Sequence, residues 1–189
     1  CISLLGAVSS KSIELVKQMI EREINAPQAR GVGRYFDGFG ALALGRTRST
    51  YEGQVAIAWD QVADESVSDA YPFEVDRAHT PWEVDLRPAV RAAVHDLGAA
   101  VPAGVVSARF HNALVAVTVS LLEALWADRS DLSVALTGGV FQNAWLAGGV
   151  AKQLSHKINI LRHSDVPPGD GGIALGQALF ADAVLGDKG

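Results

Sequence analysis

The sequence predicts an α/β fold in which helices predominate around one parallel pair of strands. Two short stretches, SVALT (133–137) and INILR (158–162), are rich in β-branched apolar residues, and each is followed by a glycine-rich turn and a helical pattern. Strand, helix, strand and helix in this spacing are typical of a right-handed βαβ unit with parallel strands. The SVALT segment, with apolar residues at Val134, Ala135 and Leu136, is expected to be covered on both faces, as buried parallel strands are.

Helical patterns fill most of the chain before this unit. Ile13, Val16 and Ile20 recur at helical spacing behind a serine that can cap the first turn. Pro102 suits the first turn of a long helix. The predicted helices span residues 9–24, 31–44, 49–64, 86–97 and 102–128, and the polar segment 65–81 holds one candidate strand at 73–75.

The composition suits one globular domain or lobe over residues 1–189, with its most informative segments at 31–64 and 102–185. Hydrophobic residues make up 49% of the chain, and no apolar run approaches the ~20 residues of a membrane span. The formal net charge of −5, with 16 dispersed basic residues, disfavours a nucleic-acid partner. The only cysteine is Cys1, so a cytoplasmic protein is expected, and a start at Cys rather than Met indicates a piece of a longer protein.

The paired glycines Gly138 and Gly139 follow the first strand of the βαβ unit, where a helix is expected to begin. A helix amino terminus presents unpaired N–H groups to an anion such as phosphate, and glycine lets the backbone approach it. Asn143 adds an amide in the first turn of that helix. The alternative interpretation is an ordinary tight turn followed by an exposed Asn.

Asp170 stands in PPGDGG (167–172), at the start of the last predicted helix, which spans 173–185. Its carboxylate could hold a metal ion or orient a water, or it could cap that helix. Because both glycine-rich turns follow parallel strands, they are expected at the same edge of the sheet, where ligands usually bind.

Other polar residues are ambiguous by themselves. Asp37 lies within a predicted helix, where exposure is the simplest explanation, and Glu52 in the first turn of the next helix is an ordinary response to the helix dipole. His111 is expected to be a packed, hydrogen-bonded side chain. The five histidines form no HxxxH or HExxH motif, and the chain has no GxSxG or phosphate-binding GxxxxGK[ST] loop.

Five segments together resemble the carboxyl-terminal domain of the HypF family of hydrogenase-maturation carbamoyltransferases. In chain order they are GRYFDGFGALALG, STYEGQVA, ARFHNAL, LTGGVFQN and PPGDGGIALGQAL. The combination of GGVFQN with PPGDGGIALGQA is the most specific part. That domain is similar to the tRNA threonylcarbamoyltransferases and to antibiotic O-carbamoyltransferases, and the resemblance implies the second lobe of the two-lobed actin, Hsp70 and sugar-kinase (ASKHA) fold.

The resemblance implies transfer of a carbamoyl group from an ATP-derived carbamoyl-adenylate to a carboxyl-terminal cysteine thiol of a HypE-like partner. The family's site residues map onto Gly138, Gly139 and Asn143 for the nucleotide, Asp37 and Glu52 for its ribose side, and Asp170 for a divalent metal, iron or zinc. The resemblance identifies no catalytic residue.

Departures from the family pattern imply that this chain holds half of a site. The metal-binding HHxAH-type segment and the acylphosphatase-like, zinc-finger and adenylating domains are absent, and Arg30, Gly31 and Val32 replace a usual Ser-Ser-Met. The chain alone is therefore expected to be inactive, with the missing upstream parts supplied in cis or in trans. The alternatives are a non-catalytic nucleotide-binding remnant of the superfamily and an O-carbamoyltransferase acting on a small molecule.

Overall fold

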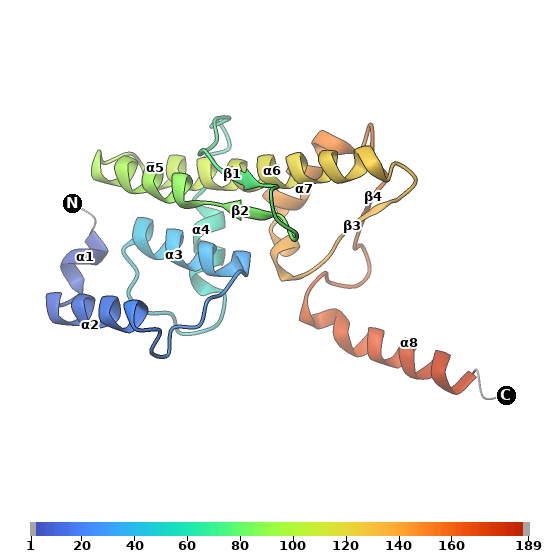
Figure 1. Cartoon of the computed structure of the whole chain (residues 1–189), viewed down its shortest axis with the longest axis horizontal. Helices are drawn as coiled ribbons and strands as arrows, with labels where there is room; N and C mark the ends of the chain where they lie inside the picture. Colours follow the sequence, from blue (N-terminus) through green and yellow to red (C-terminus); the bar gives the residue numbers. More distant parts are fainter. Residues whose placement is uncertain (1–2, 187–189) are drawn as a thin grey trace. The chain divides into compact units, whose positions relative to one another are not determined.

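The computed structural model describes residues 3–186, and Cys1 lies outside them. The chain forms two compact units, Cys1–Ala113 and Leu114–Gly189. Figure 1 shows the course of the described chain and labels its helices and strands. In chain order the elements are α1 (Ser3–Ala7), α2 (Ser10–Glu21), α3 (Val32–Leu44), α4 (Gln54–Gln61), β1 (Glu74–Asp76), β2 (Glu83–Asp85), α5 (Arg87–Gly98), α6 (Ala103–Asp128), β3 (Val134–Leu136), α7 (Ala144–Leu154), β4 (Ile160–Arg162) and α8 (Ile173–Gly186). Helix α6 begins in the first unit and ends in the second.

The first unit is held together by an aromatic cluster between α3, α4 and α6. Phe110 of α6 lies at its centre, with its ring 5.0 Å from that of Phe36, 4.4 Å from that of Phe39 and 6.2 Å from that of Trp59. Helix α3 can approach α4 closely because Gly40 has no side chain: a Cβ there would lie 2.7 Å from a methyl group of Val55. Gly40 therefore permits the close packing of α3 against α4.

Helix α6 is long and apolar enough by length and composition to cross a membrane, with a mean hydropathy of 1.5 over its most apolar 18 residues. Half of that window is buried inside the structure, and both Ser107 and His111 have no exposed surface. A central helix of a globular protein has these same properties, because it is apolar on every side that meets a neighbour.

The predicted helix at 9–24 is confirmed as α2, although it ends at Glu21. The Ser9 hydroxyl caps it by accepting a 3.1 Å hydrogen bond from the Ser12 N–H. No residue of α2 is buried within the described chain, so its apolar residues at Val16 and Ile20 remain exposed. The candidate strand at 73–75 is found as β1, one residue later, and the sequence reading missed its antiparallel partner β2.

The second unit contains the predicted βαβ arrangement. Strands β3 and β4 pair in parallel, with Ala135 opposite Leu161, and α7 connects them. Gly149 of α7 packs against Val115 of α6, because a Cβ at Gly149 would lie 2.7 Å from a Val115 methyl group. The expectation that SVALT is covered on both faces is wrong for the described chain: Leu136 is buried, whereas Ala135 on the opposite face is exposed.

Candidate functional site

Two glycine-rich turns meet at the carboxyl end of β3 in the second unit. The Gly138 N–H donates a 2.7 Å hydrogen bond to the Pro168 carbonyl. A Cβ built on Gly169 would lie 3.3 Å from the Gly139 Cα and 2.7 Å from Nε2 of Gln142. The prediction that both turns lie at one edge of the sheet is therefore confirmed by direct contact between them.

The structure explains the presence of glycine differently at the two positions of the pair. Gly138 has φ 96° and ψ 157°, a conformation that only glycine adopts without strain. A Cβ on Gly139 would meet no atom within 4 Å, so the folded chain gives no steric reason for glycine there. Gly139 opens a 3₁₀ turn, Gly139–Gln142, in which the N–H groups of Gly139 and Val140 make no backbone hydrogen bond among the described residues. Such groups are free to bind an anion.

Asn143 lies at the residue before α7, where a helix-capping side chain is usually found. Its Oδ1 accepts a 2.8 Å hydrogen bond from the Leu146 N–H. The expectation that it lies within the first helical turn is wrong, because the 3₁₀ turn delays the start of α7 to Ala144. Asn143 therefore caps α7, and any contact that it makes with a ligand must be compatible with this structural role.

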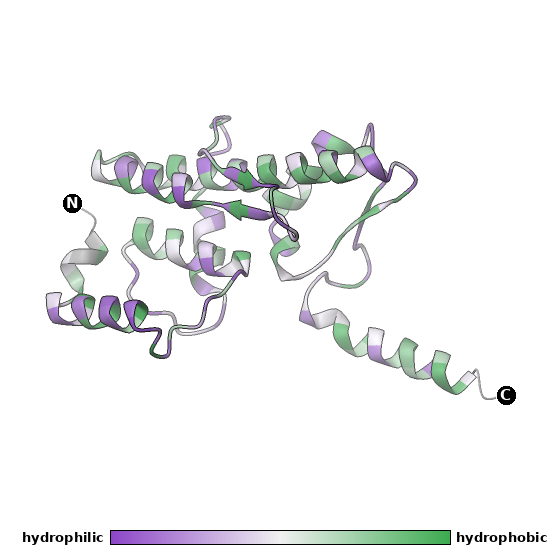
Figure 2. Cartoon of the chain, viewed as in Figure 1, coloured by the Kyte–Doolittle hydropathy of each residue, from purple (hydrophilic) through white to green (hydrophobic). Residues whose placement is uncertain are grey.

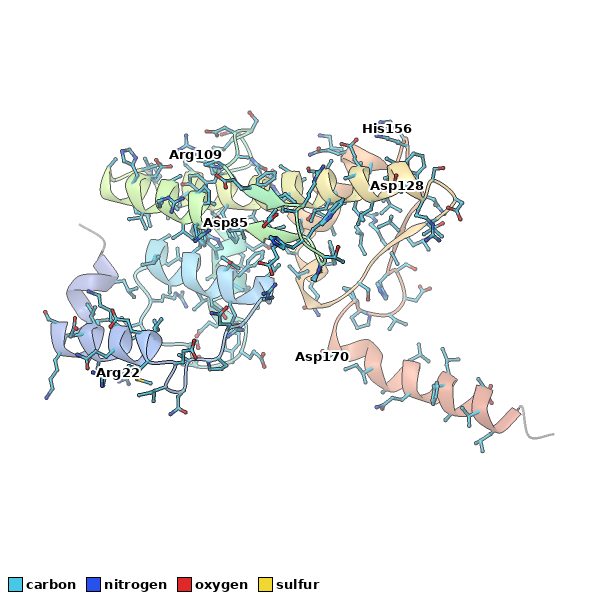
Figure 3. All side chains as sticks on the ribbon, in the orientation of Figure 1. Arg22, Asp85, Arg109, Asp128, His156 and Asp170 are labelled. Carbon is cyan, nitrogen blue, oxygen red and sulfur yellow. The ribbon has the colours of Figure 1, made fainter. Side chains whose placement is uncertain are left out.

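Asp170 lies at the start of a second 3₁₀ turn, Asp170–Gly172, which leads into α8 (Figure 3). The side chain is exposed, and the described residues give it no hydrogen-bond partner, so the helix-cap interpretation lacks the bond that defines a cap. The glycines after it have a packing role: a Cβ on Gly171 would lie 2.8 Å from Pro167, and one on Gly172 would lie 2.9 Å from Val166.

Asp37 and Glu52 line the same hollow of about 480 Å³ in the first unit, between α3 and the loop that precedes α4. The Asp37 carboxylate is half-buried and lies 2.9 Å from the Arg34 guanidinium, so it is an ion-paired side chain of α3. Glu52 is exposed and precedes α4, which begins at Gln54 after Gly53 in the left-handed conformation (φ 79°). The predicted start of this helix near residue 49 is thus wrong.

Three arginines line this hollow. They were not predicted as site residues, because the basic residues are dispersed along the sequence. They are Arg34, Arg46 and Arg48. Arg46 and Arg48 have no acidic partner within 4.0 Å in the part of the chain that the structure describes. The detectable signal was the spacing R-x-R immediately before the STYEGQ segment. Two unpaired cations beside two carboxylates make the hollow suitable for a ligand that carries both hydroxyl and anionic groups.

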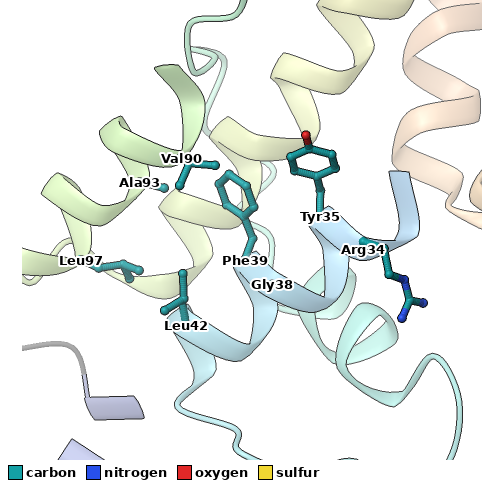
Figure 4. A pocket seen from close by; sticks show the side chains of 8 residues that line it. All are labelled: Arg34, Tyr35, Gly38, Phe39, Leu42, Val90, Ala93 and Leu97. Atoms are coloured by element: carbon teal, nitrogen blue, oxygen red, sulfur yellow. The ribbon is translucent and has the colours of Figure 1, made fainter. Parts of the chain in front are cut away.

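A second, smaller hollow of about 140 Å³ lies between α3 and α5 (Figure 4). Phe39 and Leu42 of α3 face Val90, Ala93 and Leu97 of α5 there. The wall is almost wholly apolar, and it carries none of the residues predicted for the site. It is a packing groove of the first unit.

His111 is buried, as expected for a packed side chain. Its Nδ1 lies 2.8 Å from the Ser107 carbonyl, and its Nε2 lies 3.6 Å from the Asp60 carboxylate. Removal from water lowers the pKa of His111, and the Ser107 carbonyl and Asp60 oppose that shift. The ring is 5.4 Å from that of Phe36, so His111 is part of the core of the first unit.

No cluster of three or more His, Cys, Asp or Glu side chains that could hold a metal ion occurs within residues 3–186. Asp170 is a single exposed carboxylate, and a stable site for iron or zinc needs three or four ligands. The described residues therefore do not by themselves fit a complete metal centre.

The sequence matches the family model described as carbamoyltransferase, Kae1-like domain, second subdomain, over residues 3–177. It is 34% identical over 173 residues to a carbamoyltransferase HypF from Rhodobacter capsulatus, covering 91% of this chain and 22% of the relative. It is 33% identical to a carbamoyltransferase HypF homolog from Cupriavidus necator, covering 93% of this chain and 46% of that relative. The chain thus spans about a fifth of the first relatives it matches.

The fold is also similar to a crystal structure described as full-length HypF in the phosphate- and nucleotide-bound form. The match has a TM-score of 0.88 at 30% identity and covers 96% of this chain and 24% of that one. Three observations indicate the same family: the sequence match, the similar fold, and the glycine-rich turns at the edge of a parallel strand pair. The chain belongs to the Kae1-like carbamoyltransferase domain family and corresponds to its second subdomain.

Proposed function

We propose that this chain supplies the nucleotide-binding lobe of a hydrogenase-maturation carbamoyltransferase in the cytoplasm, with the two-lobed ASKHA architecture. The reaction is carbamoyl transfer from carbamoyl-adenylate to a cysteine thiol of a HypE-like protein. The observation that carries the proposal is the paired-glycine turn, where Gly139 borders open space and the N–H groups of Gly139 and Val140 make no backbone hydrogen bond among the described residues. A 30% identical relative described as phosphate- and nucleotide-bound supports it.

The adenylate phosphate is proposed to lie against the turn at Gly138 and Gly139. Backbone N–H groups at the start of a helical turn bind phosphate oxygens through aligned dipoles and without a side-chain charge. A side chain at Gly139 would occupy the open space beside these groups. Asn143 is held in a fixed rotamer by its bond to Leu146, and its amide nitrogen is proposed to donate to the nucleotide.

Asp37 and Glu52 are proposed to accept hydrogen bonds from nucleotide hydroxyl groups in the hollow that they share within the first unit. Carboxylate oxygens accept hydrogen bonds from ribose hydroxyl groups, and Arg34 keeps the Asp37 carboxylate oriented from a distance of 2.9 Å. The polar wall and the volume of about 480 Å³ suit a nucleoside.

In the proposed transfer, the thiolate sulfur of the acceptor attacks the carbamoyl carbon of the adenylate. A carbon–sulfur bond forms, the carbon–oxygen bond to the phosphate breaks, and AMP leaves with the electron pair, while the thiol proton goes to solvent or a base. The contribution of this chain is to hold the leaving phosphate and so to position the carbamoyl carbon.

Asp170 is proposed to provide this chain's one ligand to a divalent metal, which would withdraw charge from the carbamoyl or phosphate oxygen when bound. Because residues 3–186 contain no cluster of three or more possible ligands, the remaining ligands are proposed to come from a segment outside this chain. In a complete enzyme, Asp170→Ala is expected to abolish transfer to the thiol while leaving adenylate synthesis intact; transfer that persists in this variant would contradict the assignment.

Calorimetric titration of the 189-residue chain with AMP and with a non-hydrolysable carbamoyl-adenylate mimic tests nucleotide binding. Gly139→Ala is expected to weaken binding about tenfold or more, because its methyl group projects beside the phosphate-binding N–H groups. Gly148→Ala is the matched control, since a Cβ there also meets no atom within 4 Å but lies on α7. Equal affinities of the two variants would place the nucleotide elsewhere.

A further inference from the structure

The side chain of Gln142 lies where the two glycine-rich turns of the second unit meet. A Cβ built on Gly169 would lie 2.7 Å from the Gln142 Nε2 and 3.3 Å from the Gly139 Cα. The carboxamide of Gln142 therefore borders Gly139, whose own Cβ position faces open space with no atom within 4 Å. Gln142 is exposed, so its carboxamide is accessible to a ligand that enters that space.

The 3₁₀ turn Gly139–Gln142 explains this position. Three residues complete one turn of such a helix, so residues that are three apart in the sequence project from the same side. Gln142 comes three residues after Gly139, and its side chain consequently projects from the side of the turn on which Gly139 leaves open space. In an α-helix the same two residues would be rotated apart by about 60°.

Few polar side chains of the two turns are available to a ligand. Helix α8, which follows the second turn, is mostly hydrophobic (Figure 2), so the polar chemistry at this edge comes from the turns. The Thr137 hydroxyl lies 3.5 Å from a carbonyl of the second turn, and Asn143 caps α7. The Asp170 carboxylate can only accept hydrogen bonds. Among the described residues of the two turns, Gln142 is the one whose side chain offers both a donor and an acceptor and makes no hydrogen bond.

A carboxamide is the chemical complement of a carbamoyl group. Each has a carbonyl oxygen and an NH₂ group on one planar carbon, so the two groups can pair through two N–H···O hydrogen bonds. With the adenylate phosphate at Gly138 and Gly139, as proposed above, a single bridging oxygen separates the phosphorus from the carbamoyl carbon. The carbamoyl group is then within reach of Gln142, whereas the adenine base lies beyond the ribose, on the other side of the phosphate.

We infer that the Gln142 carboxamide binds the carbamoyl group of the adenylate through one donated and one accepted hydrogen bond, and so selects carbamoyl over other acyl groups. The inference rests on the proposed function, because it needs the phosphate at the paired glycines. An acetyl group keeps the carbonyl oxygen but has a methyl group in place of NH₂, and it leaves the Gln142 Oε1 without a donor. A site that hydrogen-bonds a polar group of its substrate rejects an analogue that lacks this group, because the site's own polar atom is then left unpaired.

Calorimetric titration of the 189-residue chain with two acyl sulfamate analogues of the adenylate tests this selectivity. One analogue carries a carbamoyl group and the other an acetyl group, and AMP, which has neither, is the third probe. The wild-type chain is expected to bind the carbamoyl analogue about tenfold more tightly than the acetyl analogue. Gln142→Met has nearly the same shape without a donor or an acceptor. It is expected to reduce this preference to about twofold or less by weakening the binding of the carbamoyl analogue alone.

Gln153→Met is the matched control, because Gln153 is also exposed but lies near the far end of α7. It is expected to keep the wild-type preference, and both variants are expected to melt like the wild type because both side chains are exposed. An unchanged preference in Gln142→Met overturns the inference. Equally weakened binding of all three probes by Gln142→Met also overturns it, because the residue would then contact the nucleotide and not the carbamoyl group.

The wild-type chain separates failure of this inference from failure of the proposed function. If it binds AMP and both analogues but does not distinguish carbamoyl from acetyl, the inference is overturned and the nucleotide site stands. If it binds none of the three probes, the phosphate does not lie at the paired glycines, and the proposed function and the inference are overturned together.

Discussion

The backbone N–H of Gly138 lies 2.7 Å from the carbonyl oxygen of Pro168, and this hydrogen bond joins two turns that are 30 residues apart in the sequence. The Thr137 hydroxyl lies 3.5 Å from the same carbonyl. The bond fixes the first glycine in its unusual conformation and leaves the second facing open space. In this turn, Gly138 is required for the backbone conformation, whereas Gly139 leaves the space beside the backbone open to a ligand.

Gly138→Ala is expected to destabilise the chain by about 1–3 kcal/mol, because a residue with a Cβ is strained at φ 96° and ψ 157°. Gly139→Ala is the matched control and is expected to change the unfolding free energy by less than about 0.5 kcal/mol. Urea unfolding followed by circular dichroism measures both. Equal losses of unfolding free energy in the two variants would show that glycine is required at both positions for the same structural reason.

Asn143→Ala is expected to lower the unfolding free energy by about 1 kcal/mol, because the Leu146 N–H loses its capping acceptor. Asn143→Asp keeps an acceptor and should preserve stability, but its charge should weaken binding of an adenylate phosphate. Thermal unfolding and calorimetric titration of both variants separate the two effects. An Asp variant that binds AMP like the wild type would remove Asn143 from the nucleotide site.

His111 is expected to make stability depend on pH. Burial lowers its pKa in the folded state below the ordinary value of about 6.5, so below that pH the unfolded chain binds a proton that the folded chain resists. Stability is therefore full above about pH 6.5 and declines as pH falls through it, by up to about 1.4 kcal/mol between pH 7.5 and 5.5.

Urea unfolding at pH 7.5, 6.5 and 5.5 measures this change. His111→Gln removes the titrating group, and it should flatten the pH dependence whatever its effect on absolute stability. A variant that loses stability on acidification as steeply as the wild type would assign the effect to other groups.

Tyr71→Phe is expected to cost about 1–1.5 kcal/mol. The Tyr71 hydroxyl donates a 2.8 Å hydrogen bond to Asp96, which also accepts a 2.7 Å bond from Arg109. Burial, followed by the hydrogen bond to Asp96 and then by the charge of Asp96, raises the pKa of Tyr71. The control is Tyr51→Phe at an exposed side chain, which should be neutral in thermal unfolding; equal shifts in the two melting temperatures would contradict a role for the Asp96 bond.

Local sequence patterns were sufficient for the kind and order of most elements. The serine before α2 and the apolar spacing within it identified a helix, because capping and periodicity act over a few residues. The parallel pairing of β3 and β4 also followed from local patterns, since a strand–helix–strand connection has few alternatives.

The predictions from sequence were wrong where a single backbone angle, or a contact with a residue distant in the sequence, determines the structure. The start of α4 depends on the left-handed conformation of Gly53, which the apolar pattern around it does not reveal. Helix α7 begins only at Ala144 because a 3₁₀ turn precedes it. The residue types of that turn do not distinguish it from the first turn of an α-helix. The exposure of Ala135 depends on which layers are present to cover the sheet, and no local pattern records that.

The sequence by itself determined the α/β character, the parallel pair, the two glycine-rich turns and the family, because these are properties of short segments. Only the tertiary structure decided that Gly138 and Pro168 touch, that Asn143 is a helix cap, and that Arg46 and Arg48 share a hollow with Asp37 and Glu52. These relationships join residues through backbone turns and packing, and their distances are set by the fold as a whole.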